Sequence, residues 1–216
     1  MFDTYARSDE AVRILGPKKV LLHPSDAELL IYTCLELQDC AKANWLGHSD
    51  WRLAWCEGRT LASQLKRWEI SPTSQPCCHA PSAKFLDEDT YPWMFQEGTP
   101  GYYLIDFAGR YRGLEWGDQE DELVAEFGTK LFARAPEQCV MEAAFAFFMR
   151  NGGERLLEYD YHWGAIEDAS ESRCAVGVFD DKGWSITMIE PYVEGEDHVV
   201  CLWRKPELGL ISKPGA

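Results

Sequence analysis

The sequence predicts an α+β fold: a largely antiparallel sheet of about five or six strands packed against helices, with a helical N-terminal part. Apolar residues recur every three to four positions in much of residues 1–70, whereas alternating apolar residues are frequent in residues 93–216. Four prolines fall in the segment 71–92 between them. Because 216 residues with 46% hydrophobic composition can bury a full core, we expect one compact unit.

Two helices are expected in the N-terminal part. Ser25 is a suitable N-cap for a helix over residues 27–43, which is apolar around most of its circumference and therefore predicted to be buried. A second helix is expected after Ser49, because apolar residues there form one stripe at helical spacing. The stripe consists of Trp51, Trp55, Leu61, Ala62, Leu65 and Trp68.

Residues 71–92 have no apolar period and are expected to form a loop or linker. They contain Cys77, Cys78 and His79, a combination that resembles half of a metal site or of a nucleophilic site. A reactive thiolate needs an activating base or an electropositive setting, and the sequence indicates none. We therefore favour a loop without catalytic chemistry.

The C-terminal part is expected to contain most of the strands. Residues 101–116 have the pattern of a hairpin that turns at Gly109. A short acidic helix is expected over 119–127, and an apolar helix over 136–150, with Pro at its start and glycines after its end. Further strands are predicted over residues 155–163, 174–179, 184–189 and 198–204.

The formal net charge of −15 is unevenly distributed along the chain. Residues 1–86 carry ten Lys or Arg and ten Asp or Glu, whereas residues 87–216 carry eleven and twenty-six. Acidic clusters in expected loops or helix starts favour a positively charged partner. The candidate partner-binding residues are Asp118, Glu120, Asp121, Glu122, Glu167, Asp168, Glu171, Glu194, Glu196 and Asp197, with Trp116 and Trp163 as nearby apolar anchors.

A metal-assisted enzyme is the alternative from a different class. Glu158, Asp160 and His162 would share one face of an extended strand, and such a set offers oxygen and nitrogen ligands to a divalent metal. Glu194, Glu196 and His198 repeat the pattern. A solvated sheet face that is polar at every second residue explains both patterns more simply. We therefore expect no metal and no cofactor.

Several other function classes receive no support from the sequence. It contains no GxSxG, P-loop, GxGxxG, HExxH, EF-hand or CxxC motif. No basic cluster is large enough to favour direct nucleic-acid binding, and no apolar run is long enough to span a membrane. Without an export signal, the chain is expected to be cytoplasmic, with its eight cysteines reduced and mostly in the core.

These properties predict a non-enzymatic acidic inhibitor that binds a basic protein. In its composition and organisation the chain resembles the immunity proteins with which bacteria neutralise their own secreted toxins. That resemblance implies a nuclease-type toxin as the partner, because a nuclease presents Lys and Arg to phosphate. The same charges would also suit a phage anti-defence inhibitor, either an anti-CRISPR protein or a DNA mimic.

Overall fold

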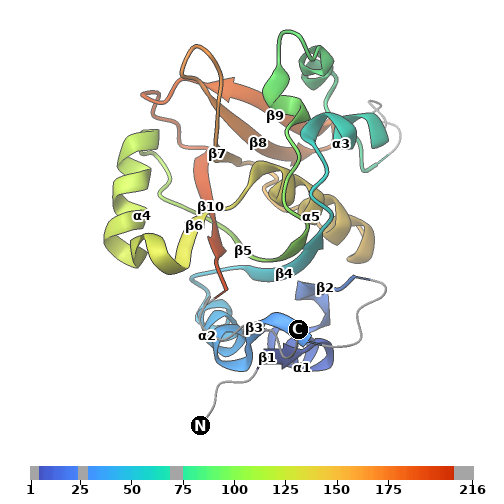
Figure 1. Ribbon diagram of the computed structural model, residues 1–216, viewed down its shortest axis with the longest axis vertical. Coiled ribbons are helices and arrows are strands. Elements are labelled where there is room, and N and C mark those ends of the chain that lie inside the picture. The colour runs from blue at the N-terminus through green and yellow to red at the C-terminus, as the bar shows by residue number, and fades with distance from the viewer. Residues whose placement is uncertain (1–4, 24–28, 69–74, 207–216) are drawn as a thin grey trace, which may run out of the picture.

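The structure is a computed structural model that describes residues 5–23, 29–68 and 75–206 of the chain. Its centre is a mixed eight-stranded sheet in the order β2-β4-β5-β10-β7-β8-β9, with β6 also paired to β10 (Figure 1). The β2–β4 and β10–β7 pairs are parallel, and the other pairs are antiparallel. The strands are β2 (Val20–Leu21), β4 (Trp51–Cys56), β5 (Gly101–Arg110), β6 (Phe132–Arg134), β7 (Tyr161–Glu167), β8 (Arg173–Asp180), β9 (Gly183–Ile189) and β10 (His198–Arg204).

The α+β class is therefore confirmed, but the prediction of a five- to six-stranded antiparallel sheet is wrong. The sheet is larger because β2 and β6 have only two and three residues, too few for an alternating pattern to be visible in the sequence. It is mixed because the β2–β4 and β10–β7 pairs are parallel, and β10 has partners along both of its edges. One edge pairs with β5, and the other pairs first with β7 and then with β6.

The prediction of a helical N-terminal part is also wrong. Helices α1 (Ser8–Leu15), α2 (Cys34–Trp45) and α3 (Leu61–Arg67) alternate there with strands, and β1 (Tyr5–Arg7) pairs with β3 (Leu29–Thr33). The helix expected over 27–43 is therefore split into β3 and α2. Its expected N-cap, Ser25, lies outside the described residues. The actual N-cap is Thr33, whose side chain accepts a hydrogen bond from the backbone N–H of Glu36 in a capping box.

The second expected helix is likewise a strand followed by a helix. Residues Trp51–Cys56 form β4, and α3 begins after Thr60, whose side chain accepts a hydrogen bond from the backbone N–H of Ser63. Leu53 and Ala54 are both fully buried, and they belong to different hydrophobic clusters. A strand that is buried on both faces gives a continuous apolar run, which satisfies the helical period as well as the strand period.

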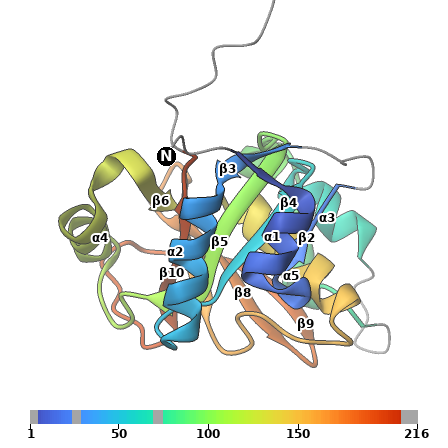
Figure 2. The same cartoon turned by 90° about the horizontal axis from the view of Figure 1, so that it is seen from below.

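Helices cover both faces of the β4-β5-β10 part of the sheet. Helices α1 and α2 lie side by side on one face (Figure 2), where Leu53, Leu104 and Leu202 contribute to the same cluster. Helix α5 (Glu137–Arg150) covers the other face, toward which Ala54 and Ile105 point. The alternation along each strand thus divides the core into two layers.

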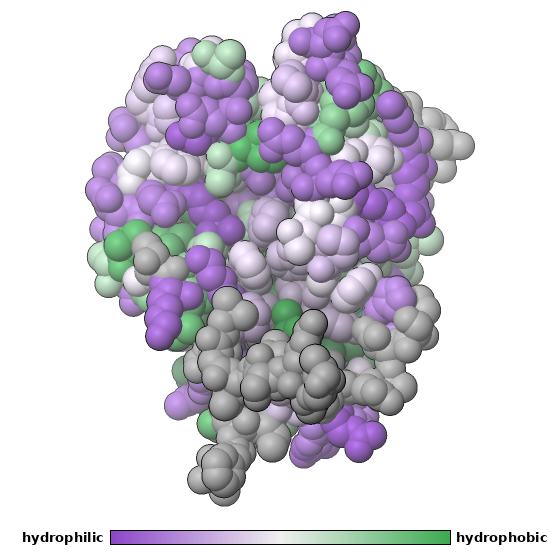
Figure 3. Space-filling model, viewed as in Figure 1, coloured by the Kyte–Doolittle hydropathy of each residue, from purple (hydrophilic) through white to green (hydrophobic). Residues whose placement is uncertain are grey.

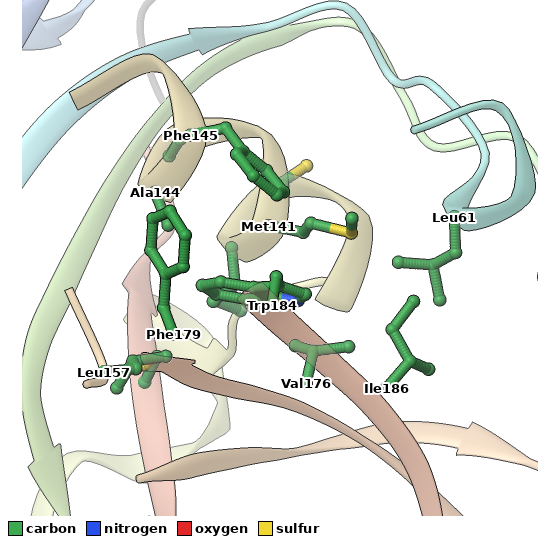
Figure 4. Packing of buried hydrophobic residues seen from close by; sticks show 14 of the residues in the cluster. Leu61, Met141, Ala144, Phe145, Leu157, Val176, Phe179, Trp184 and Ile186 are labelled. Atoms are coloured by element: carbon green, nitrogen blue, oxygen red, sulfur yellow. The ribbon is translucent and has the colours of Figure 1, made fainter. Parts of the chain in front are cut away.

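Helix α5 also packs against β7 and β8, so the sheet bends around it (Figure 1). Trp184 of β9 is fully buried and lies under Met141 and Phe145 of α5, beside Val176 of β8 (Figure 4). The rings of Phe145 and Trp184 are 5.8 Å apart between centroids. This apolar packing explains why the helix predicted over 136–150 is confirmed.

The other C-terminal predictions differ in accuracy. The strands expected over 174–179, 184–189 and 198–204 are present, and the acidic helix is present as the longer α4 (Trp116–Leu131). The hairpin over 101–116 is wrong, because β5 is one long strand paired with β4 and β10. The strand expected over 155–163 begins only at Tyr161.

The segment expected to be a loop or linker packs against the core over its described part. It contains the 3-10 helix Ala80–Leu86, in which Phe85 is buried, and His79 donates its backbone N–H to the Trp184 carbonyl at 2.8 Å. In the described part of the chain, no helix is long and apolar enough to cross a membrane.

Candidate protein-binding surface

Three of the predicted acidic clusters lie around one side chain, Trp116, at the start of α4. The first cluster is on α4 itself, the second on the turn between β7 and β8, and the third on the loop between β9 and β10. The backbone N–H of Trp116 donates to the Pro191 carbonyl at 2.9 Å, and its indole Nε1 donates to the Gly164 carbonyl at 2.8 Å. These bonds join α4 to the two neighbouring segments.

Two arginines hold the indole of Trp116 in place. The guanidinium carbons of Arg134 and Arg173 each lie 4.4 Å from the centroid of the Trp116 ring. Arg134 also forms an ion pair with Glu120 at 2.9 Å, and Arg173 forms one with Glu167 at 2.5 Å. Trp116 is half-buried, and the two guanidinium groups and the Gly164 carbonyl fix its ring, so only part of the indole faces solvent.

A third arginine attaches the loop between β9 and β10. The Nη1 of Arg112 lies 2.5 Å from the Asp160 carboxylate and donates to the Glu196 carbonyl at 2.6 Å. The hydrogen bond to Asp160 is the largest effect that raises the pKa of the Arg112 guanidinium. The same loop exposes Tyr192 by 65% and Val193 by 40%. We define the acidic face as the first half of α4 with residues 167–172 and 190–197.

Carboxylates exceed cations on the acidic face. Arg112, Arg134 and Arg173 are each paired with a carboxylate. Within the described ranges, by contrast, six of the exposed predicted carboxylates have no ion-pair partner: Asp118, Asp121, Glu122, Glu171, Glu194 and Glu196. Figure 3 shows hydrophilic residues over the upper part of α4 and the loops above it. An excess of unpaired carboxylates gives this face a negative potential.

Four predicted site residues have structural roles instead. Glu120 is paired with Arg134, and Glu167 with Arg173. The Asp168 carboxylate accepts hydrogen bonds from the backbone N–H groups of Ser170 and Ser172, and so orders the turn after β7. Asp197 lies 3.6 Å from the imidazole of His198.

The prediction that Trp163 is a surface anchor is wrong. Its side chain is fully buried, and its ring centroid lies 4.9 Å from that of His198. Trp163 follows His162 in β7, where residues of both parities are covered, so sequence alternation does not indicate which tryptophan is accessible. The exposed aromatic residue that sequence analysis missed is Tyr192. The sequence feature that could have indicated its exposure is its position between acidic residues, in a segment without a regular spacing of apolar residues.

The first metal hypothesis fails on geometry. Glu158 and Asp160 precede β7, so they do not share a strand face with His162. Both imidazole nitrogens of His162 have protein partners: Nδ1 accepts from the Cys201 backbone N–H at 3.0 Å, and Nε2 lies 2.7 Å from the Ala135 carbonyl. Burial lowers the pKa of His162 to about 4. Across the described residues, no group of three or more His, Cys, Asp or Glu side chains is arranged to hold a metal ion.

The repeat of this pattern near β10 does not form a set of ligands either. Glu194 and Glu196 are exposed in the loop, whereas His198 is buried at the start of the strand. The side chains therefore do not lie on one strand face, as the alternation in the sequence suggested.

The Cys77-Cys78-His79 segment shows no sign of an activated thiol. Both cysteines are buried, and burial raises the pKa of Cys78 to about 12, which keeps its thiol protonated at neutral pH. His79 Nδ1 lies 3.3 Å from the Ser185 hydroxyl and not beside a thiol that it would activate. Seven of the eight cysteines are buried, in agreement with the expectation that most of them lie in the core.

No protein-family model, curated protein or solved structure matches this chain.

Proposed function

We propose that the protein is a cytoplasmic, non-enzymatic inhibitor that binds a basic protein through the acidic face. The partner class that fits best is a bacterial nuclease-type toxin, and the protein would then act as its immunity protein. The observation that carries the proposal is the convergence of three acidic clusters, from separate parts of the chain, around Trp116. A nuclease exposes Lys and Arg where it binds phosphate, and an acidic protein can dock there in place of the nucleic acid.

The acidic face combines the two properties that a specific interface of this kind needs. Its unpaired carboxylates speed the encounter with a positive partner over a range set by the Debye length, about 8 Å at physiological salt. Tyr192 and Val193 supply exposed apolar surface within the charged area, beside the half-buried Trp116, and aromatic residues commonly form the desolvated centre of an interface. The negative charge also disfavours direct binding of nucleic acid.

Charge reversal on α4 tests the proposal. Asp118, Asp121 and Glu122 are exposed and have no ion-pair partner among the described residues, so their replacement by Lys should leave folding intact. Glu120 is left unchanged because it pairs with the buried Arg134. A matched control reverses Glu88, Asp89 and Asp181, which are exposed and lie outside the acidic face.

Affinity capture with wild type and control should recover the same basic protein, and the α4 variant should lose it. The association rate with that protein should fall by tenfold or more in the α4 variant, and it should also fall for wild type between low and physiological salt. If the α4 variant binds the partner at the wild-type rate, the acidic face is not the interface and the proposal is wrong.

A further inference from the structure

A pocket of about 560 Å³ lies between α3, α5 and the end of β4. These elements lie at the right of Figure 1, whereas α4 lies at the left. Apolar side chains supply much of the wall: Leu21, Leu22, Trp55, Trp68, Phe145, Ala146 and Met149. The rings of Trp68 and Phe145 are stacked, with centroids 4.9 Å apart and planes inclined by 12°. Both the volume and the aromatic lining are typical of small-molecule sites.

The charges of this pocket are opposite to those of the acidic face. Arg67 and Arg150 line it and are exposed, and neither forms an ion pair with another residue in the described part of the chain. Arg59 is the third arginine of the wall, and it is paired with Glu57 and Glu142. Three arginines and two glutamates thus give the pocket wall a net charge of +1, in a chain whose net charge is −15, and the two arginines without partners are the ones that remain open to an anion.

Three polar atoms in the pocket wall lack hydrogen-bond partners within the described residues. They are the acceptors Gln64 Oε1 and Glu142 Oε2 and the donor Trp55 Nε1. Gln64 is only 1% exposed, and its amide Nε2 already donates to the carbonyls of Arg59 and Gln138. Buried polar groups without partners are rare in native proteins, and each one calls for an explanation. Three of the twelve such atoms among the described residues belong to side chains that line this pocket, so a polar ligand would find both acceptors and a donor there.

We propose that this pocket binds a small anionic aromatic molecule. The planar ring packs on the apolar wall beside Trp68, and the acidic group binds Arg67 and Arg150 through charge-assisted hydrogen bonds. A donor group on the ring hydrogen-bonds to Gln64 and Glu142. Both acceptor oxygens are buried, so side chains of the wall must move for the donor to reach them. Nucleoside monophosphates and aromatic carboxylic acids share this chemistry.

Titration of the full chain with three probes tests the proposal and distinguishes the two sources. The probes are adenosine 5′-monophosphate, indole-3-acetate and inorganic phosphate, and binding is measured by calorimetry and by ligand-observed NMR. Millimolar or tighter binding of either aromatic probe, with phosphate at least about tenfold weaker, is the expected result. The aromatic probe that binds more tightly identifies the source. If neither binds, or if phosphate binds as tightly as the aromatic probes, the proposal is wrong.

Charge reversal places the bound probe in the pocket. The Arg67→Glu/Arg150→Glu double variant should weaken binding at least about tenfold, because both positions change from attraction to repulsion of the acidic group. The control variant Arg13→Glu/Lys42→Glu makes the same change of net charge at exposed sites outside the pocket and should bind like wild type. Equal affinity in the pocket variant and the control would overturn the proposal.

This inference is independent of the proposed inhibitor function, because the α4 residues reversed in that test do not line the pocket. The Asp118→Lys/Asp121→Lys/Glu122→Lys variant should therefore bind the aromatic probe with wild-type affinity. Loss of probe binding in that variant would contradict the assignment of the site to this pocket.

Discussion

The acidic face and the α3–α5 pocket use arginine in opposite ways. On the acidic face, Arg112, Arg134 and Arg173 each have a carboxylate partner, and the remaining carboxylates are in excess. In the pocket wall, the carboxylates Glu57 and Glu142 both pair with Arg59, so Arg67 and Arg150 have no carboxylate partner and the wall has an excess of one positive charge. One face is therefore suited to a basic partner and the other to an anionic ligand.

This difference is not visible in the charge balance of the sequence. The neutral N-terminal part contributes Arg67 to the pocket, whereas the acidic C-terminal part contributes Arg150 from the last turn of α5. The fold thus places basic residues from both parts together on one side. It places acidic residues from three separate segments on the other. The distribution of charge along the chain indicates the sign of the charge expected on the main partner. It does not show where on the molecule the acidic and basic surfaces lie.

The largest expected effect is the difference in stability loss between replacing the buried Arg134 of the acidic face and replacing the exposed Arg67 of the pocket. Arg134 is buried, and its guanidinium binds Glu120, Gln119 Oε1 and the carbonyls of Trp116 and Trp163. Arg134→Met leaves these acceptors unpaired, so the free energy of unfolding should fall by about 3–5 kcal/mol. Arg67→Met, at an exposed position, should change it by less than about 0.5 kcal/mol. Urea denaturation at pH 7 measures both values.

The Arg134→Lys variant shows, in the same experiment, whether the positive charge of Arg134 or the planar geometry of its guanidinium supplies the stability. An ammonium keeps the positive charge but cannot reproduce a planar fork that binds four acceptors, so most of the loss should remain. Equal losses in Arg134→Met and Arg67→Met would show that Arg134 does not support the acidic face as its contacts indicate.

The next effect is a pH dependence beneath the acidic face. Burial lowers the pKa of His162 to about 4, whereas an unfolded histidine titrates near 6.5. Between these values the unfolded state binds a proton that the native state does not, so native stability falls as the pH falls from 6.5 to 4. The expected loss is on the order of 3 kcal/mol across this window, and it should not grow below pH 4.

Urea denaturation between pH 4 and pH 7 checks this expectation by comparing slopes. His162→Gln removes the titrating group, so its stability should change less steeply with pH than that of wild type. His48→Gln is the control, because His48 is exposed, and it should keep the wild-type slope. A His162→Gln variant with the same slope as wild type would show that the pH dependence originates elsewhere.

Sequence analysis placed correctly those elements whose apolar pattern fits only one kind of secondary structure. Residues 136–150 are long, apolar and bounded by Pro and Gly, so only a buried helix fits. The strand around Cys174 and the strand that starts at His198 lie between clear turns. In contrast, β3 and β4 are apolar on both faces, and each is followed closely in the sequence by a helix, α2 or α3. Sequence period cannot separate strand from helix in such runs.

Sequence analysis identified the acidic residues of the candidate surface, but not which of them are paired or how they are arranged. The acidic residues of α4 and of the two loops were identified from composition, because unpaired carboxylates belong in solvent. Which of them are paired depends on arginines distant in sequence: Asp160 lies 48 residues from its partner Arg112. Trp163 was misplaced because the bend of the sheet covers both faces of β7. The pocket was missed because its wall joins segments from Leu21 to Arg150.

The smallest expected effect is at Arg52, a guanidinium whose setting is intermediate between those of Arg134 and Arg67. Arg52 is itself buried and pairs with two carboxylates: Asp50 at 2.9 Å and Glu154 at 2.6 Å, of which the Glu154 side chain is 40% exposed. The hydrogen bond from Arg52 is the largest effect that lowers the pKa of Glu154, to about 2. Because solvent screens a carboxylate that exposed, Glu154→Gln should cost only about 1 kcal/mol at pH 7.

The sign of the pH dependence gives this last prediction its test. The pKa of Glu154 is lower in the native state than the usual 4.5, so the pair stabilises the protein fully above that value. Its contribution is lost as the pH falls toward 2, and wild type and Glu154→Gln should therefore converge in urea denaturation between pH 4.5 and pH 2. Glu158→Gln is the matched control, since Glu158 lies 3.8 Å from Arg155, and it should match wild type throughout. A constant difference between wild type and Glu154→Gln across this range would show that the loss of stability does not come from the charge of Glu154.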